Sequence, residues 1–307
     1  MTDSGPRRGR LLVPLLSVLF VPLWASGFIV GTIATGEMAV PTVLLCRFVI
    51  ALAVMLAVAA FVRPALPRGR AWLHLAVTAL LLQVGQFTFV YSGLSAGVPA
   101  GLSSLIMGMA PLLVGLLTPL LLTTRLGVAP VLGLLIGAAG VYVVLSDELG
   151  GGAGTAAVFP LLGMFSLAAG TLYQKRFNDE TPIVTSVVVQ MATSLMVTLV
   201  AWPLLGAAWL PTSAAGWGAV AFLGVVNSAG AFALLFVLLR LRSTVHVSAL
   251  LNLVPATTAL AAVPILGEEL TVQALLGLAI ALVGMYVGIG RLPWRRRTPE
   301  RRVAARA

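Results

Sequence analysis

Arg47 is a charged side chain inside a long apolar stretch that runs from Met38 to Val62. A guanidinium about 10 Å deep in a membrane costs at least about 2.5–3.5 kcal/mol to insert, so it should face a cavity or a partner. Such a group can bind a carboxylate of a solute, or act as a gate through Glu37 or Glu268. The structural alternatives are snorkelling toward the outer surface and a clamp on carbonyls of a neighbouring helix.

Uncharged amides and aromatic rings form a second group within apolar stretches. An amide costs energy in lipid and gains by facing a neighbouring helix or a wet cavity, and aromatic rings form walls suited to an amphipathic solute. Interfacial anchoring is the expected role of Tyr142 and Tyr286, near helix ends. The other residues of this group are predicted to line a central cavity and bind a small molecule: Trp24, Gln83, Gln86, Tyr91, Tyr173, Gln190, Asn227 and Asn252.

Catalytic and metal chemistry find little support in the residue types. His74 and His246 are the only histidines, Cys46 is the only cysteine, and no His-Glu-x-x-His zinc motif is present. The only lysine, Lys175, follows Gln174, so no phosphate-binding loop exists. We expect no enzyme, no cofactor and no metal. Buried serines leave a catalytic alternative open, although packing is the commoner role of such residues: Ser103, Ser104, Ser228 and Ser248.

The composition is that of a membrane protein built of helices. Of the 307 residues, 60% are apolar and 9% charged, whereas soluble domains carry about a quarter charged residues. The same low charge excludes a disordered chain, and the long unbroken apolar runs are unlike the short alternating strands of a membrane barrel. Cutting the sequence at its charges gives ten spans of about 20 residues, which predicts an all-α polytopic membrane protein.

The basic residues sort to one side of these spans. With the N-terminus inside, 18 of the 19 Lys and Arg residues fall in inner segments, and the exception is Arg47. The charged residues of the outer loops are all acidic: Glu37, Asp147, Glu148, Glu268 and Glu269. The positive-inside rule therefore predicts a multi-pass protein of a bacterial cytoplasmic membrane with both termini inside, a tail at 1–10 and a basic tail at 291–307.

The +10 net charge follows from this topology rather than from a nucleic-acid partner. Too few residues lie outside the spans to build a folded nucleic-acid-binding module. The arginines of the C-terminal tail are instead suited to contact anionic lipid headgroups.

The two halves of the sequence match at an offset of 144 residues. The identities at this offset include Ser104/Ser248, Pro111/Pro255, Leu126/Leu270, Gly133/Gly277, Gly140/Gly284 and Tyr142/Tyr286. The halves, 11–146 and 149–290, hold five spans each, and because five is odd the two copies cross the membrane in opposite senses. Pro111 and Pro255 lie inside spans at matching positions, where each frees a carbonyl, so we predict paired hinges.

Short motifs occur along both halves of the chain. In the first half they are Trp24–Phe28, Pro41 with Arg47–Phe48, Gly97–Gly101 and Gly108–Pro111. In the second half they are Gly170–Arg176, Pro255 and Gly267–Glu268. In their order and spacing, these motifs resemble those of EamA-type transporters of the drug/metabolite transporter superfamily. Two positions depart from the family pattern: Thr32 replaces a lysine, and Thr123–Thr124 replace a Gly-Glu pair.

The resemblance implies a secondary transporter of two inverted five-helix repeats. It suggests export of amino acids, related metabolites or toxic amphiphiles by alternating access, against proton entry. Glu268, at the outer end of the ninth span, is the candidate for proton coupling, and a solvated surface charge is the alternative. A membrane-embedded enzyme or lipid-handling protein that uses the same polar cavity stays open, as does a homodimer.

Overall fold

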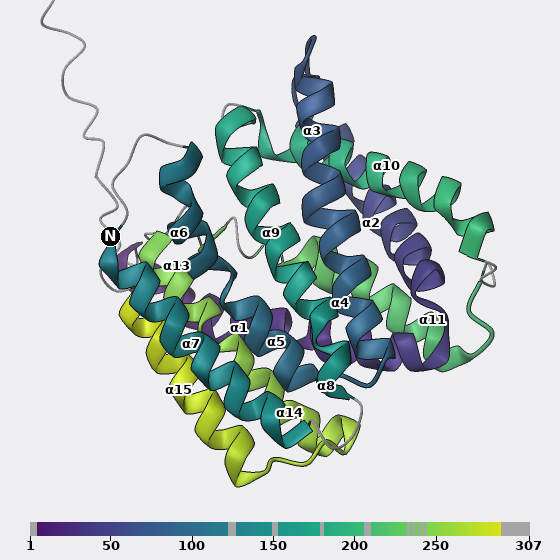
Figure 1. Ribbon diagram of the computed structural model, residues 1–307. Helices are drawn as coiled ribbons and strands as arrows, with labels where there is room; N and C mark the ends of the chain where they lie inside the picture. Colours follow the sequence, from purple (N-terminus) through teal and green to yellow (C-terminus); the bar gives the residue numbers. More distant parts are fainter. Residues whose placement is uncertain are drawn as a thin grey trace, which may run out of the picture.

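Every element that the structure describes is a helix. The computed structural model (Figure 1) describes residues 5–121, 127–148, 153–178, 181–205, 210–231, 234, 237–238, 241 and 244–289. Within these ranges, eight helices are long and apolar enough to cross a membrane, and two shorter apolar helices, Ala214–Ser228 and Val272–Gly288, complete a set of ten. The predicted all-α polytopic fold is confirmed. The predicted tail at 291–307 lies outside the described residues.

The first half of the chain forms five spans. The first two spans are α1 (Gly5–Glu37) and α2 (Val40–Val62). The third consists of α3 (Ala71–Ala79), η1 (Leu80–Gly85) and α4 (Gln86–Ser95), and the fourth of α5 (Ala100–Gly108) and α6 (Ala110–Leu121). The fifth is α7 (Val128–Glu148). Helix α1 begins at Gly5, so it extends into the segment predicted as the N-terminal tail at 1–10. Pro41 lies in the first turn of α2, where its missing N–H has no intrahelical partner to lose.

The second half forms five further spans. The sixth span is α8 (Ala153–Ala156) with α9 (Val158–Phe177), and the seventh is α10 (Ile183–Ala201) with η2 (Trp202–Leu205). The eighth is α11 (Ala214–Ala221) with η3 (Phe222–Ala231), and the ninth is α13 (Thr244–Leu251) with α14 (Val254–Leu266). The tenth is α15 (Val272–Ile289). Ser213 caps α11 by accepting the N–H of Gly216 at 2.9 Å. Helix α14 ends at Gly267, whose φ of 71° is left-handed and suits glycine.

The fourth and ninth spans are both interrupted, and the interruptions are related by the 144-residue offset. Helix α5 ends at Gly108 and α6 begins at Ala110, while α13 ends at Leu251 and α14 begins at Val254. Pro111 and Pro255 are the second residues of the helices that follow the two breaks. Proline is tolerated in a first turn and prevents the helix from continuing from the preceding segment. The matching prolines therefore mark matching breaks.

The third and eighth spans contain π-helical stretches, which are also related by the same offset. The stretch η1 spans Leu80–Gly85 and η3 spans Phe222–Ala231. Gln83 in the first and Asn227 in the second are 144 residues apart. A π turn widens the helix and shifts the direction of the side chains beyond it, and such turns are frequent at functional sites.

Helices α7 and α15 lie side by side along one edge of the molecule (Figure 1). Glycines allow their backbones to touch. A Cβ added at Gly133 would lie 2.5 Å from the Cα of Gly288, and one added at Gly140 would lie 2.5 Å from the backbone nitrogen of Ala281. Larger residues at these positions would force the two helices apart, so this pair of repeat-related helices packs as tightly as membrane helices can.

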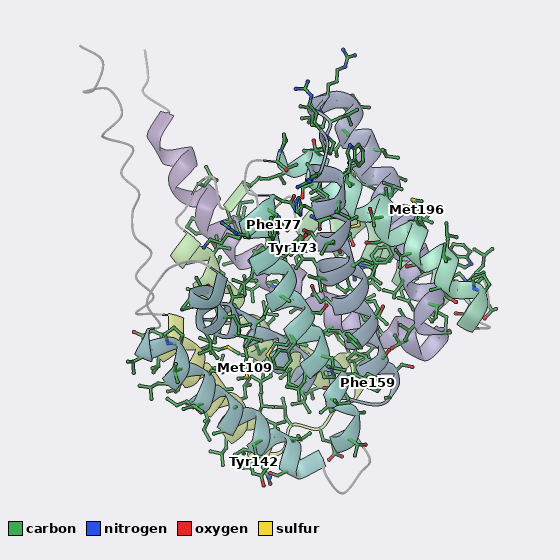
Figure 2. The ribbon with its side chains drawn as sticks, turned by 45° about the horizontal axis from the view of Figure 1, so that its top comes forward. Met109, Tyr142, Phe159, Tyr173, Phe177 and Met196 are labelled. Atoms are coloured by element: carbon green, nitrogen blue, oxygen red, sulfur yellow. The ribbon has the colours of Figure 1, made fainter. Side chains whose placement is uncertain are left out.

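Large apolar side chains cover the outside of the bundle, as expected for a protein whose solvent is lipid. Tyr142 on α7 and Tyr286 on α15 are 67% and 78% exposed, and Met196 on α10 is 67% exposed. Figure 2 shows Tyr142 and Met196 at opposite margins of the molecule. The centre is filled by fully buried side chains such as Phe48, Tyr91 and Met285. The two repeat-related tyrosines thus lie on the outer surface, away from the interior.

Candidate functional site

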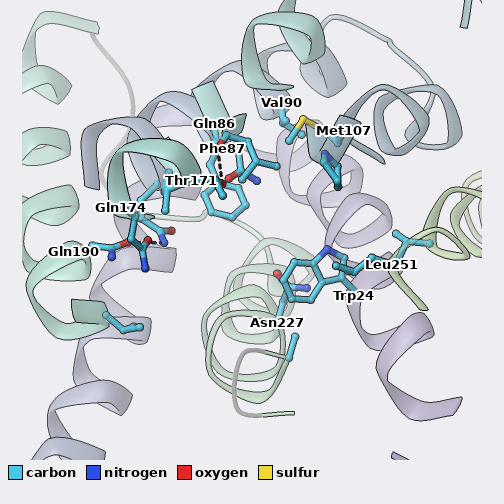
Figure 3. Close-up of a pocket in the computed structure, with 18 of the residues that line it drawn as sticks. Trp24, Gln86, Phe87, Val90, Met107, Thr171, Gln174, Gln190, Asn227 and Leu251 are labelled. Atoms are coloured by element: carbon cyan, nitrogen blue, oxygen red, sulfur yellow. Dashed lines mark hydrogen bonds between the residues drawn. The ribbon is translucent and has the colours of Figure 1, made fainter. Parts of the chain in front are cut away.

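A cavity of about 720 Å³ lies between the two halves of the chain. Its lining comes from α1, α2, the third and fourth spans of the first half, and from α9, α10, η3, α13 and α14 of the second. Figure 3 shows Gln174 and Gln190 on one side of this space and Trp24 and Leu251 on the other. Cavities of this size hold small organic molecules. The predicted binding residues that line it are Trp24, Arg47, Gln83, Gln86, Tyr91, Gln190, Asn227 and Asn252.

Arg47 lies at the side of the cavity formed by α2, α4 and η3. Its side chain is only 2% exposed. Nη1 donates to the hydroxyl of Tyr91, and Nη2 donates to Oδ1 of Asn227 at 3.1 Å. The guanidinium carbon lies 3.8 Å from the centre of the Phe87 ring, close enough for a cation–π contact. Arg47 therefore has neutral partners that fix its direction and leave its charge in place.

Asn227 joins three helices at this point. Besides accepting from Arg47 on α2, it donates from Nδ2 to the carbonyl of Leu23 on α1 at 3.3 Å. Gly27 on α1 makes room for it, because a Cβ there would lie 2.7 Å from Nδ2 of Asn227. Asn227 is half-buried and lines the cavity. Its amide therefore contacts α1 and α2 of the first repeat and borders the open space of the cavity.

A pair of glutamines joins the corresponding helices, η1 and α10. Gln83 donates to Gln190 at 3.5 Å, a long hydrogen bond, and Gln190 donates to Ser186 at 2.8 Å. Gln83 is the offset partner of Asn227, and α10 corresponds to α2, although Met191 and not Gln190 is the offset partner of Arg47. The cavity is therefore flanked by two contacts between repeat-related pairs of helices, one cationic and one neutral.

Polar residues at the end of α9 and the start of α10 extend the lining beyond the predicted set. They are Gln174, Lys175, Asn178, Thr181 and Ser186. Asn178 is 5% exposed; its Nδ2 donates to Thr78 at 2.9 Å, and its Oδ1 has no hydrogen-bond partner among the described residues. Sequence reasoning missed these residues because polar side chains are ordinary at helix ends. The helical spacing from Thr171, which also lines the cavity, is the signal that points to them.

Tyr173 was predicted to bind substrate, and the structure places it elsewhere. Its hydroxyl lies 2.8 Å from Nδ1 of His74, and its ring packs against Phe177. Figure 2 labels Tyr173 and Phe177 next to each other. The His74 ring also stacks on Phe177. Tyr173 thus ties α9 to α3 and does not line the cavity, because it lies on a different face of α9 from Thr171 and Lys175.

Glu268 is neither a free surface charge nor part of the cavity lining. Its Oε1 accepts the backbone N–H of Ala100, the first residue of α5, at 2.7 Å. Pro99, which precedes α5, offers no side-chain cap. A carboxylate at a helix N-terminus satisfies an orphan donor and interacts favourably with the helix dipole. The contact crosses from the second half of the chain to the first.

Comparison with known proteins identifies the architecture. The model of the EamA-like transporter family matches residues 11–146 and again residues 154–289. The chain belongs to this family. The two matches contain five spans each, so the EamA-like fold is a pair of inverted five-helix repeats, as predicted.

Relatives of this EamA-like chain cover nearly its whole length. A "Probable amino-acid metabolite efflux pump" of Escherichia coli (strain K12) is 26% identical, with 92% of this chain and 96% of that protein covered. A protein of the same name from Salmonella typhimurium is 27% identical, with 89% and 93% covered. A solved crystal structure with 21% identity has a TM-score of 0.65 and covers 90% of this chain and 97% of its own, which shows a shared fold.

Four serines left a catalytic alternative open in the EamA-like chain. Two of them have structural hydrogen-bond partners, one has none among the described residues, and the side chain of the fourth is not described. Ser104 and Ser228 donate to backbone carbonyls of Gly101 and Leu223. The hydroxyl of Ser103 has no partner among the described residues, and the side chain of Ser248 lies outside them. In the part of the chain that the structure describes, no three His, Cys, Asp or Glu side chains gather as a metal site. Family membership identifies the chain as a transporter.

Of the two departures from the family pattern, the described residues include only the one at Thr32. Thr32 donates its hydroxyl to the carbonyl of Phe28 within α1 at 3.1 Å and is absent from the cavity lining. It therefore acts inside its own helix. Thr123 and Thr124 lie outside the described residues.

Proposed function

We propose that this chain is a secondary transporter of a bacterial cytoplasmic membrane that exports a small organic metabolite by alternating access, with both termini in the cytoplasm. The observation that carries the proposal is the cavity of about 720 Å³ that residues of both inverted repeats line together. In transporters built this way, one repeat rocks against the other around a site near the bilayer midplane. A cavity between the repeats is where such rocking changes a solute's access.

The extent of the lining supports a conformation open toward the cytoplasm. It reaches Lys175 and Thr181, which the charge bias assigns to the inner side. It includes no residue of the described outer segments 37–40, 96–99 and 267–271. A solute would enter this conformation from the cytoplasm, as export requires.

Two contacts between the repeats support closure on the outer side. Glu268 of the second repeat accepts the N–H of Ala100 in the first, and Glu37 of the first repeat accepts the hydroxyl of Ser213 in the second. Opening the cavity to the outside requires the two repeats to separate here. We therefore assign these contacts to the outer gate.

The relatives and the sequence support the direction and the energy source. Two relatives are named amino-acid metabolite efflux pumps, so a metabolite of that kind is the proposed cargo of this chain as well. The sequence holds no phosphate-binding loop, so either an ion gradient supplies the energy or the solute equilibrates passively. We propose the gradient, in the form of proton entry, with Glu268 as the group that takes up the proton.

Blocking the cavity tests the proposed function. Thr171 is exposed and lines the cavity, so Thr171→Trp adds an indole to the open space without displacing core side chains. Purified protein in liposomes should exchange a labelled metabolite saturably, and Thr171→Trp should slow the exchange at least about 10-fold at unchanged abundance. Tyr142→Trp, a control on the outer surface, should keep the parent rate. Parent-like exchange by Thr171→Trp, or no saturable exchange of any metabolite by the parent, would contradict the proposal.

A further inference from the structure

We propose that the exported solute is an organic anion whose carboxylate binds Arg47, and that it needs no ammonium group. The inference rests on the proposed transport function and adds a charge class to it. The first observation is the sign of the charges around the cavity. Arg47 is a cation in this lining, and none of the described lining residues is an acid. Such a cavity favours solutes of net negative charge.

The second observation is that the charge of Arg47 is held but not neutralised. A guanidinium carries five N–H donors, and two of them have protein acceptors among the described residues, the Tyr91 hydroxyl and the Asn227 amide oxygen. Phe87 adds a ring face, which is also neutral. A cation buried without a counter-ion is costly, and an arriving carboxylate offsets that cost by forming charge-assisted hydrogen bonds.

The third observation is how a carboxylate can reach a guanidinium that is only 2% exposed. Asn227 is half-buried, faces the cavity and accepts from Nη2 through a single neutral bond of 3.1 Å. A carboxylate is the stronger acceptor, so it takes the place of the Asn227 oxygen. Because Asn227 belongs to the second repeat and Arg47 to the first, this exchange also releases one contact between the repeats when the solute binds.

The repeat symmetry shows why the anion binds on one side of the cavity. The corresponding helices of the other half, η1 and α10, meet through Gln83–Gln190, which carries no charge, and Met191 occupies the offset position of Arg47. The rest of the wall offers amides and apolar surface, including Trp24, which suit the uncharged body of a solute. An ammonium group would meet no described acid in this cavity. N-acylated amino acids and other amphiphilic carboxylates therefore fit better than zwitterions or cations.

A set of size-matched probes tests the charge class on the unaltered protein. The probes are N-acetylleucine (anion), leucine (zwitterion), N-acetylleucinamide (neutral) and leucinamide (cation), together with their phenylalanine equivalents. In liposomes, the two anions should be exchanged with kcat/KM at least about 10-fold above the other classes. Preference for zwitterions, neutral amides or cations overturns the inference and leaves the transport function standing. Absence of saturable exchange for every probe and every other metabolite would count against the transport function itself.

A pair of isosteric variants tests the role of Arg47. Asn227→Asp places a carboxylate against Nη2, where it competes with the solute, and should lower the preference for anions at least about 10-fold. Gln83→Glu adds the same charge to the same cavity at the repeat-equivalent position, beside neutral Gln190, and should lower it less. The ratio of anion to neutral-amide exchange is the readout, because a merely structural defect lowers both equally. Equal loss of anion preference in the two variants would refute Arg47 as the anchor.

Discussion

At the scale of the residue, the chemistry of the cavity depends on how Arg47 is held. Phe87, Tyr91 and Asn227 fix the guanidinium without cancelling its charge, so it keeps donors for a ligand. The insertion cost of a charge predicted a cavity or a partner for this side chain, and both are present. The two acids considered as its gating partners, Glu37 and Glu268, bond elsewhere.

Glu268 allows helix capping and proton coupling to be separated. Glu268→Gln keeps an oxygen that can accept the N–H of Ala100 but removes the carboxylate, so pH-driven flux should be lost while solute binding and Tm stay near the parent values. Glu268→Ala removes the cap as well and should cost about 1 kcal/mol of stability. Flux driven by imposed pH gradients and thermal unfolding measure the two effects. Undiminished pH-driven flux in Glu268→Gln would remove Glu268 from the coupling mechanism.

Sequence reasoning found many of the cavity's polar residues because each of these lies where lipid would penalise it. It did not find their pairings, since the partner of Arg47 is 180 residues away. Tyr173 was assigned to the cavity on its type alone, and its position on α9 turns it toward His74 instead. Asn178, which lines the cavity, was missed because its polarity is unremarkable at the end of a helix.

At the scale of the element, the repeat preserves irregularities as well as helices. Breaks in the fourth and ninth spans, and π-helical stretches in the third and eighth, recur at the same offset. The prolines were predictable marks of the breaks. The π turns had no such mark, because a widened turn depends on packing rather than on one residue type. These wide turns carry Gln83 and Asn227, so they shape the cavity directly.

The paired prolines are predicted to be hinges between helix segments. In Pro111→Ala and Pro255→Ala, the restored N–H can bond to the carbonyl four residues earlier, at Met107 and Leu251, and join the two segments into one stiffer helix. Each variant should slow exchange about 10-fold more than it lowers abundance. Pro264→Ala, at an exposed position inside α14, is the control and should exchange at the parent rate. Parent-like rates in both hinge variants would show that the breaks are static.

At the scale of the whole molecule, two inverted copies enclose one asymmetric site. Composition and charge placement predicted the ten spans, because membrane insertion allows few alternatives to apolar helices, and the identities at the 144-residue offset predicted their pairing into repeats. The repeat could not predict the charge of the site, because Met191 of the second copy occupies the position equivalent to Arg47 of the first. In the proposed mechanism, the symmetric part of the chain supplies the rocking scaffold, and the part that differs between the copies selects the solute.

The most direct test of alternating access through this cavity is thiol labelling at its two ends. Ser104→Cys in α5 lies toward the outer side and Thr181→Cys toward the inner side, both in a Cys46→Ala background. Labelling rates with a polar maleimide would be compared at rest and during solute exchange. We predict that exchange raises labelling of Ser104→Cys and lowers that of Thr181→Cys. Rates that rise together, or stay constant while solute moves, would show that the cavity is not the alternating pathway.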